Sequence, residues 1–173
     1  GGHGGSIEGD GLNHGNAPIS TATIPPMEIL EAAYPVMFRQ WALRPDSAGP
    51  GRHRGGLGAV YEIEILEEKG EAFLFGERGR FPPQGVAGGE PAAVNAFSYQ
   101  QADGWHRPPL ASKMLGIKLV KGQAVRLETP GGGGYGPASD RAPEAVARDV
   151  ALGYLTPEAA TETYGPAWRE AAS

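Results

Sequence analysis

The sequence predicts an α+β fold, in which a β-rich core of antiparallel strands carries long Gly/Pro-rich loops and two short C-terminal helices. Three observations support this class. Apolar and acidic residues alternate in AVYEIEI, residues 59–65, as they do in a strand with one buried face. The 173 residues include 28 Gly and 16 Pro, which demand many turns. Residues that start and stop helices gather near the C-terminal end.

The composition divides the chain into three parts. Residues 1–26 contain much glycine and few large apolar side chains, so we expect an N-terminal Gly-rich segment of loop that packs on another surface. Residues 27–137 hold the alternating patterns and form the predicted β-rich domain, whereas residues 138–173 form the predicted C-terminal helical segment. Because 40% of the residues are hydrophobic, a single domain of this length can bury a core.

The first predicted helix is MEILEAAY, residues 27–34, which follows two prolines and spaces its apolar residues as a helix does. Pro35 disfavours the helical conformation at Tyr34, so this helix should be short. The next segment, VMFRQWAL at residues 36–43, alternates well enough to be a strand. Its predicted faces are Val36, Phe38 and Gln40 on one side and Met37, Arg39 and Trp41 on the other.

Residues 59–65 are the clearest strand, and their alternation directs Tyr61, Ile63 and Ile65 to the core. AFLFGER, residues 72–78, is predicted to pair with this strand through a turn region at residues 68–70. GIKLVKGQAVRLETP predicts two strands joined near Lys121 and Gly122. Residues 80–109 are interpreted as one long irregular segment, which indicates a functional loop, an interface or undetected elements.

Two short helices are predicted to close the chain. SDRAPEAVARDVALG has a proline-marked start near Asp140 and a stop at Gly153. Its apolar stripe comprises Val146, Val150 and Leu152. TPEAATETYG has Thr156 as its N-cap, Pro157 at the first helical position and a stop at Gly165.

The composition argues against several classes of function. A formal net charge of -5 gives no general attraction to nucleic acid or to an anionic membrane. Without cysteine the chain has no disulfide framework, no thiol nucleophile and no Cys-type zinc site. No apolar run approaches the roughly 20 residues that span a bilayer, and no secretion signal is visible. We therefore expect a cytoplasmic protein with neither nucleic acid nor membrane as a partner.

Two Gly-rich stretches are candidates for binding phosphate. TPGGGGYG, residues 129–136, lacks the Lys followed by Ser or Thr of a P-loop, so we expect a closely packed backbone crossing there. RPDSAGPGRHRGGLG, residues 44–58, is chiefly a turn into the strand at residue 59. Its arginines could bind a phosphate or a carboxylate in bidentate fashion, or could pair with the acid within the turn. The candidates for binding substrate or phosphate are Asp46, Arg52, His53 and Arg54.

The histidines show no spacing typical of a zinc protease. His3, Asp10 and His14 lie close together in the sequence and could contribute to a metal site, but the same proximity is expected of solvated polar residues in a loop. Asp10 and His14 are therefore loop candidates, and no metal ligand is assigned. No Gly-x-Ser-x-Gly elbow is present, so the catalytic residues stay unknown.

Four motifs occur in an order that resembles one enzyme family. They are YPVMFRQWALRPDSAGPGRHRGGLG, GERGRFPPQGVAGG, TPGGGGYG, and the helical EAVARDVALGYLTPEAATETYG. The opening GGHGGSIEGDGLNHGNAP is also similar to that family. Together they resemble the C-terminal part of the B subunit of the ATP-dependent hydantoinase and 5-oxoprolinase family, which includes N-methylhydantoinases and is related to acetone carboxylase.

The resemblance implies part of an enzyme that acts on hydantoins, oxoproline, lactams or, in the related carboxylases, ketones. ATP and Mg would be bound by a hydantoinase A-type subunit, which phosphorylates the amide or enol oxygen of the substrate. The oxygen then becomes a leaving group that a metal-bound water displaces. The divalent metal would be held by the N-terminal portion of the B subunit and not by this chain. Arg52 and Arg54 could bind the anionic products.

The implied partners are the N-terminal portion of the B subunit, the A-type subunit and a small cyclic amide, so the chain alone should be inactive. One alternative is a β-rich structural or assembly module of a multi-subunit complex, such as a related ATP-dependent ketone carboxylase, without catalytic residues. A second alternative is an autonomous nucleotide-binding domain. The sequence does not decide which cyclic amide or ketone is the substrate.

Overall fold

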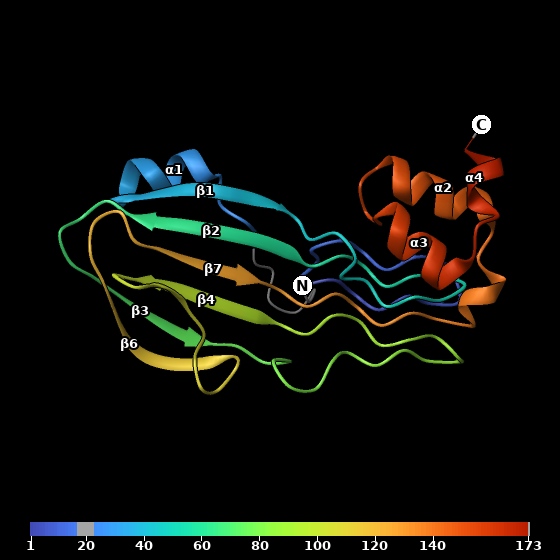
Figure 1. The fold of residues 1–173 in the computed structure, drawn as a ribbon, viewed down its shortest axis with the longest axis horizontal. Helices are drawn as coiled ribbons and strands as arrows, with labels where there is room; N and C mark the ends of the chain where they lie inside the picture. Colours follow the sequence, from blue (N-terminus) through green and yellow to red (C-terminus); the bar gives the residue numbers. More distant parts are fainter. Residues whose placement is uncertain (17–22, 173) are drawn as a thin grey trace.

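The computed structural model describes residues 1–16 and 23–172. Part of the predicted N-terminal Gly-rich segment and the last residue of the predicted C-terminal segment lie outside this range. Two antiparallel sheets lie at one end of the molecule and the C-terminal helices at the other, with long extended segments running between them (Figure 1). This arrangement confirms an α+β fold with a β-rich core of antiparallel strands.

The larger sheet has five antiparallel strands in the order β1-β2-β7-β4-β5. They are β1 (Val36–Leu43), β2 (Ala59–Ile65), β7 (Ala124–Glu128), β4 (Ala96–Gln101) and β5 (Gly104–His106). The smaller sheet pairs β3 (Gly70–Phe75) with β6 (Lys113–Leu119). The two sheets enclose a core whose buried members are Leu74, Phe97, Ile117 and Leu119.

Two predicted strand pairings are wrong. β3 pairs with β6 and not with β2, because β1 and β7 already occupy both edges of β2. The strands on either side of Lys121 and Gly122 are real, but β6 and β7 lie in different sheets. The chain thus crosses from one layer to the other at this turn, which places the apolar faces of the two sheets against each other.

The predicted facing of Trp41 is also wrong. The register of β1 against β2 shifts between Phe38 and Gln40, which inserts one extra residue into β1. Trp41 therefore lies on the same face as Phe38, and the two rings stack with centroids 5.4 Å apart. Arg39, at the bulge, donates from Nε to Glu64 Oε2 at 2.8 Å on the other face of the sheet.

Residues 80–109, interpreted as wholly irregular, contain β4 and β5. Phe97 on β4 is buried, while its polar neighbours Ser98 and Gln100 are only partly covered. The two strands form a hairpin that turns at residues 102–103 and enters β5 at Gly104, whose φ is +125°. Such a φ favours glycine, which has no Cβ to clash.

Helix α1 (Met27–Ala33) lies beside β1, and α2 (Pro143–Ala151), α3 (Pro157–Tyr164) and α4 (Trp168–Ala171) gather at the opposite end (Figure 1). The Thr156 N-cap is confirmed, because its Oγ1 accepts from Ala159 N at 3.2 Å. The sequence predicted only two helices here and missed α4, whose Trp168 is buried against α2 and α3. Leu152 was wrongly included in the buried stripe. It follows the last residue of α2 and is 55% exposed.

The segments between the sheets and the C-terminal helices form what we call the glycine bundle: residues 1–5, 47–58, 84–90 and 129–136. Residues 131–134 hydrogen-bond to the other segments on several sides. Gly5 N donates to Gly133 O and Gly49 N to Gly132 O, both at 2.8 Å, while Val86 N donates to Gly134 O at 2.9 Å. A Cβ on any of these four glycines would lie closer than 3.0 Å to a neighbouring backbone oxygen. The predicted close backbone crossing is confirmed.

Candidate functional site

Four charged side chains form a network between the glycine bundle and α2. Arg141 donates to Asp10 through both terminal nitrogens, at 2.7 and 2.9 Å, and to Asp149 Oδ2 at 2.6 Å. Arg54 Nε lies 3.2 Å from Asp149 Oδ2, and its backbone N donates to Asp10 Oδ1 at 2.9 Å. Two cations and two anions therefore balance in a site where three of the four residues are buried.

Asp10 and Arg141 stabilise each other's charged form. Burial alone would raise the pKa of Asp10, but the hydrogen bond and charge of Arg141, with the charge of Arg54, hold that pKa below its ordinary value. Burial alone would lower the pKa of Arg141, but Asp10 and Asp149 raise it above its ordinary value. Paired charges buried this deeply fix three distant segments to one another, and removing one member would leave an uncompensated charge.

A hollow of about 430 Å³ opens beside this network. Arg52, His53, Asp140 and Arg148 line it together with the edge of the network. The side chains of Arg52 and Arg148 are exposed. Neither forms an ion pair with any residue that the structure describes. The N-terminus of α2 also borders the hollow at Ala142, which offers no side-chain cap. Two free guanidinium groups and a helix N-terminus make an environment suited to a phosphate or a carboxylate.

The structure separates the predicted site residues. Arg52 and His53 line the hollow, whereas Arg54 is buried in the network behind it. Asp46 lies elsewhere and pairs with no arginine within the described residues. Its Oδ1 accepts from Thr156 N at 2.8 Å and so fixes the start of α3. Arg141 and Arg148 were not predicted, because they follow Arg52 by about 90 residues and no local motif marks them.

Asp10 and His14 lie in different places. Asp10 belongs to the charged network, whereas His14 Nε2 is 2.5 Å from the hydroxyl of Tyr61 on the sheet. Within residues 1–16 and 23–172 no three His, Asp or Glu side chains lie together as a metal site requires. In the same range no helix is long and apolar enough to cross a membrane.

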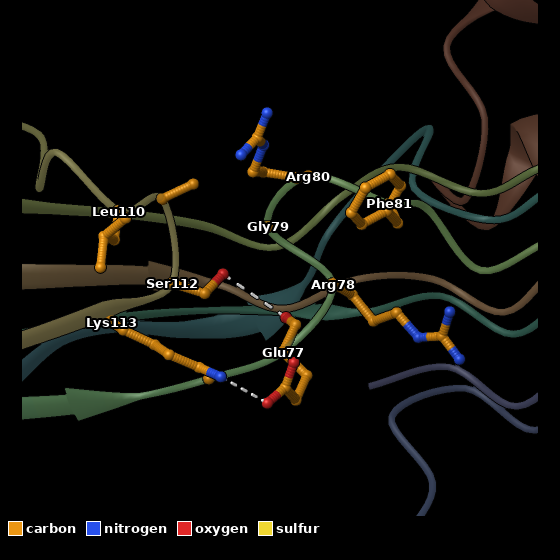
Figure 2. Close-up of a pocket in the computed structure, with 10 residues that line it drawn as sticks. Glu77, Arg78, Gly79, Arg80, Phe81, Leu110, Ser112 and Lys113 are labelled. Carbon is orange, nitrogen blue, oxygen red and sulfur yellow. Dashed lines mark hydrogen bonds and ion pairs between the residues drawn. The ribbon is translucent and has the colours of Figure 1, made fainter.

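A second surface feature is the loop of residues 76–81, which borders a hollow of about 230 Å³ (Figure 2). Below it, Lys113 Nζ lies 2.7 Å from Glu77 Oε1, while Arg80 and Phe81 point away from that pair (Figure 2). Phe81 is 75% exposed and Leu110 is 64% exposed. Arg78 has a φ of +62°, an uncommon conformation for a residue other than glycine. Exposed aromatic and arginine side chains of this kind are typical of protein interfaces.

The chain is similar to several known proteins. It is 29% identical over 165 residues to the B component of a putative D-/L-hydantoinase from Pseudomonas sp. (strain NS671), a match that covers 95% of this chain and 28% of that protein. The crystal structure of an ATP-dependent caprolactamase from Pseudomonas jessenii superimposes with a TM-score of 0.75 and 28% identity, covering 95% of this chain and 29% of that one. Nucleotide-free acetone carboxylase superimposes with a TM-score of 0.79 at 24% identity, covering 92% and 25%, which shows a shared fold.

This chain therefore spans less than a third of the length of the relatives that it matches. The name of the hydantoinase relative identifies it as one subunit of a larger enzyme. The family described as hydantoinase B/oxoprolinase matches residues 1–138, which include both sheets and the glycine bundle. By this match and the similarities to its relatives, the chain belongs to the hydantoinase B/oxoprolinase family.

Proposed function

We propose that this chain is the C-terminal part of the B subunit of an ATP-dependent hydrolase of cyclic amides. In this proposal ATP and Mg are bound by an A-type partner, which phosphorylates the amide oxygen of the substrate. The B subunit then hydrolyses the activated amide. The observation that carries the proposal is the similarity to the ATP-dependent caprolactamase, which extends over 95% of this chain.

Hydrolysis of a phosphorylated amide releases two anions, phosphate and a carboxylate, which cationic side chains can bind. Arg52 and Arg148 are the exposed cations of the hollow beside the charged network, so they are our candidates for binding one of these anions. Arg54 and Arg141 support the site indirectly, because Asp10 and Asp149 already occupy their guanidinium groups. We propose that any divalent metal is bound by the N-terminal portion of the B subunit.

A second candidate function is a β-rich assembly module without catalytic residues, within a similar hydrolase or a related ketone carboxylase. Two observations favour it. The buried Arg54 and Arg141 are paired with carboxylates of the same chain, and the exposed Arg80 and Phe81 resemble an interface more than an active site. In this case replacing Arg52 and Arg148 by alanine would leave turnover unchanged.

The test uses the full-length polypeptide that contains this sequence, coexpressed with an A-type subunit. We expect ATP-dependent ring opening of hydantoin, 5-oxoproline or caprolactam, measured as released phosphate and as the ring-opened product, which is an N-carbamoyl amino acid from hydantoin and an amino acid from the two lactams. Arg52→Ala combined with Arg148→Ala should lower turnover at least tenfold, since each charge-assisted hydrogen bond contributes about 1.5–3 kcal/mol. Lys121→Ala, at the exposed turn between β6 and β7, is the matched control.

Three other outcomes would change the assignment. Consumption of acetone and bicarbonate with no ring opening would place the chain in a ketone carboxylase. Unchanged turnover in the double arginine variant would favour the assembly module. Ring opening or ATP hydrolysis by the 173-residue chain alone would contradict the division of labour between two subunits.

A further inference from the structure

A cavity of about 460 Å³ lies on the inner face of the five-stranded sheet, away from the charged network. Its walls are mainly apolar and come from β1, β2, β7, β4 and the neighbouring β3. No Asp, Glu, Lys or Arg side chain of the described residues lines it, but Gly1 does, and the charge of its ammonium group acts on His14. This volume falls within the range of about 300–1,000 Å³ that is typical of small-ligand sites.

One wall of the cavity is aromatic. Phe38 and Trp41 stack with ring centroids 5.4 Å apart, and the ring centroids of Trp41 and Tyr61 are 4.7 Å apart. The β-bulge in β1 produces this wall, because without the extra residue Trp41 would face the other side of the sheet. Flat aromatic surfaces of this kind bind planar rings by stacking.

Two polar side chains of the cavity, His14 and Tyr61, contact each other beside this wall. His14 Nε2 lies 2.5 Å from the Tyr61 hydroxyl, and both residues line the cavity. The backbone N of His14 donates to Leu57 O at 2.7 Å, which holds the histidine against the glycine bundle. Burial lowers the pKa of His14 and raises the pKa of Tyr61, so both side chains are neutral at pH 7.

The neutral pair can present either hydrogen-bonding character to a ligand. His14 Nδ1 is buried and has no hydrogen-bond partner within the described residues, so no second bond selects the tautomer. When Nδ1 carries the proton, the Tyr61 hydroxyl donates to Nε2 and its oxygen can accept from a ligand N–H. When Nε2 carries the proton, it donates to Tyr61, and the hydroxyl can donate to a ligand carbonyl. A ligand amide fits both tautomers, because its N–H can donate to the Tyr61 oxygen and its carbonyl can accept from the Tyr61 hydroxyl.

We propose that this cavity binds the ring of a neutral cyclic amide, with the ring against Trp41 and the amide at the Tyr61 hydroxyl. The choice of cyclic amides among amide-bearing rings rests on the proposed function. The cavity itself supplies the rest: mainly apolar walls, an aromatic surface and the neutral His14–Tyr61 pair.

The experiment is a titration of the isotopically labelled 173-residue chain with hydantoin and with caprolactam, followed by NMR. Binding should shift the indole N–H of Trp41 and the imidazole of His14, while the indoles of Trp105 and Trp168 stay unchanged. Trp105 and Trp168 do not line the cavity and serve as internal controls. N-methylcaprolactam, which lacks the amide N–H, should bind several-fold more weakly than caprolactam. The titration needs neither ATP nor an A-type subunit, so its failure is distinct from failure of the proposed function.

Two variants test the assigned contact. Tyr61→Phe removes one hydroxyl and keeps the aromatic wall, so it should weaken caprolactam binding about tenfold. Tyr99→Phe makes the same change on β4, outside the cavity, and should leave the affinity unchanged. In both variants, saturating caprolactam should still change the chemical shift of the Trp41 indole N–H.

The proposal is overturned by any of three results. The first is the absence of shifts at Trp41 and His14 at millimolar ligand. The second is equal binding of caprolactam by the Tyr61→Phe and wild-type chains, which would reduce the cavity to an unselective apolar surface. The third is binding to the 173-residue chain but not to the full-length polypeptide, which would mean that other parts of the full-length chain cover this face.

Discussion

Gly132→Ala tests whether the glycine bundle depends on the absence of side chains. The new Cβ would lie closer than 3.0 Å to the carbonyl oxygen of His3, which is backbone and cannot rotate away. That oxygen accepts from Gly56 N at 2.7 Å. Gly132 itself donates to Gly56 O at 2.9 Å and accepts from Gly49 N at 2.8 Å. Making room therefore disturbs three backbone hydrogen bonds.

Each disturbed bond costs about 1 kcal/mol, and up to about 3 kcal/mol where a buried group is left unpaired. We expect Gly132→Ala to lower the free energy of unfolding by about 3–6 kcal/mol, a large part of the roughly 5–15 kcal/mol typical of a domain. The measurement is urea unfolding followed by circular dichroism, with the midpoint and slope fitted together.

The matched control is Gly9→Ala, because a Cβ at Gly9 would meet no atom within 4 Å and its φ lies outside the range that strains other residues. It should leave stability unchanged or raise it slightly, since alanine restricts the unfolded chain. The reasoning is refuted if Gly132→Ala costs no more than about 1 kcal/mol relative to Gly9→Ala, because the bundle would then tolerate side chains.

Three further changes probe the sheet, a helix and the charged network. Ile63 is only half-buried, so Ile63→Ala should cost about 1–2 kcal/mol in chemical denaturation, and Glu64→Ala up to about 1 kcal/mol through loss of its ion pair. Thr156→Ala removes the N-cap of α3 and should cost about 1 kcal/mol by the same assay. The pKa of Asp10 is lower in the folded chain than in the unfolded one, so its carboxylate stabilises the fold above about pH 4, near the ordinary value of Asp. This contribution is lost as the pH falls through the folded pKa, and Asp10→Asn should flatten the loss of stability measured in acid.

Local patterns predicted the elements that depend on near neighbours. The alternation in residues 59–65 identified β2, and the Thr156 and Gly165 signals marked the ends of α3, because strand faces and helix caps are fixed within a few residues. The strand pairings were not predictable in this way. β3 could pair with β2 only if β2 had a free edge, and β7, which is distant in the sequence, occupies the edge that β1 leaves open.

The candidate site was predictable only in part. Residues 44–58 supplied Arg52 and His53 because a dense basic stretch is visible in one window of sequence. One of the two carboxylates that bind Arg141 belongs to Asp10, which is 131 residues away along the chain. No periodicity or spacing connects residues so far apart. Their contact exists because the glycine bundle brings the segments that carry them to the same end of the molecule.

The glycine bundle also affects how the stability of this protein varies with temperature. Its contacts are between backbone amides, so unfolding it hydrates polar surface where an ordinary core would hydrate hydrocarbon. Newly exposed apolar surface raises the heat capacity by about 0.45 cal/K/mol per Å², whereas polar surface lowers it by about 0.26. The heat-capacity change per residue should therefore fall below the usual range of roughly 12–15 cal/mol/K. A small change flattens the curve of unfolding free energy against temperature, so cooling would weaken this fold less than it weakens one built on leucine and valine.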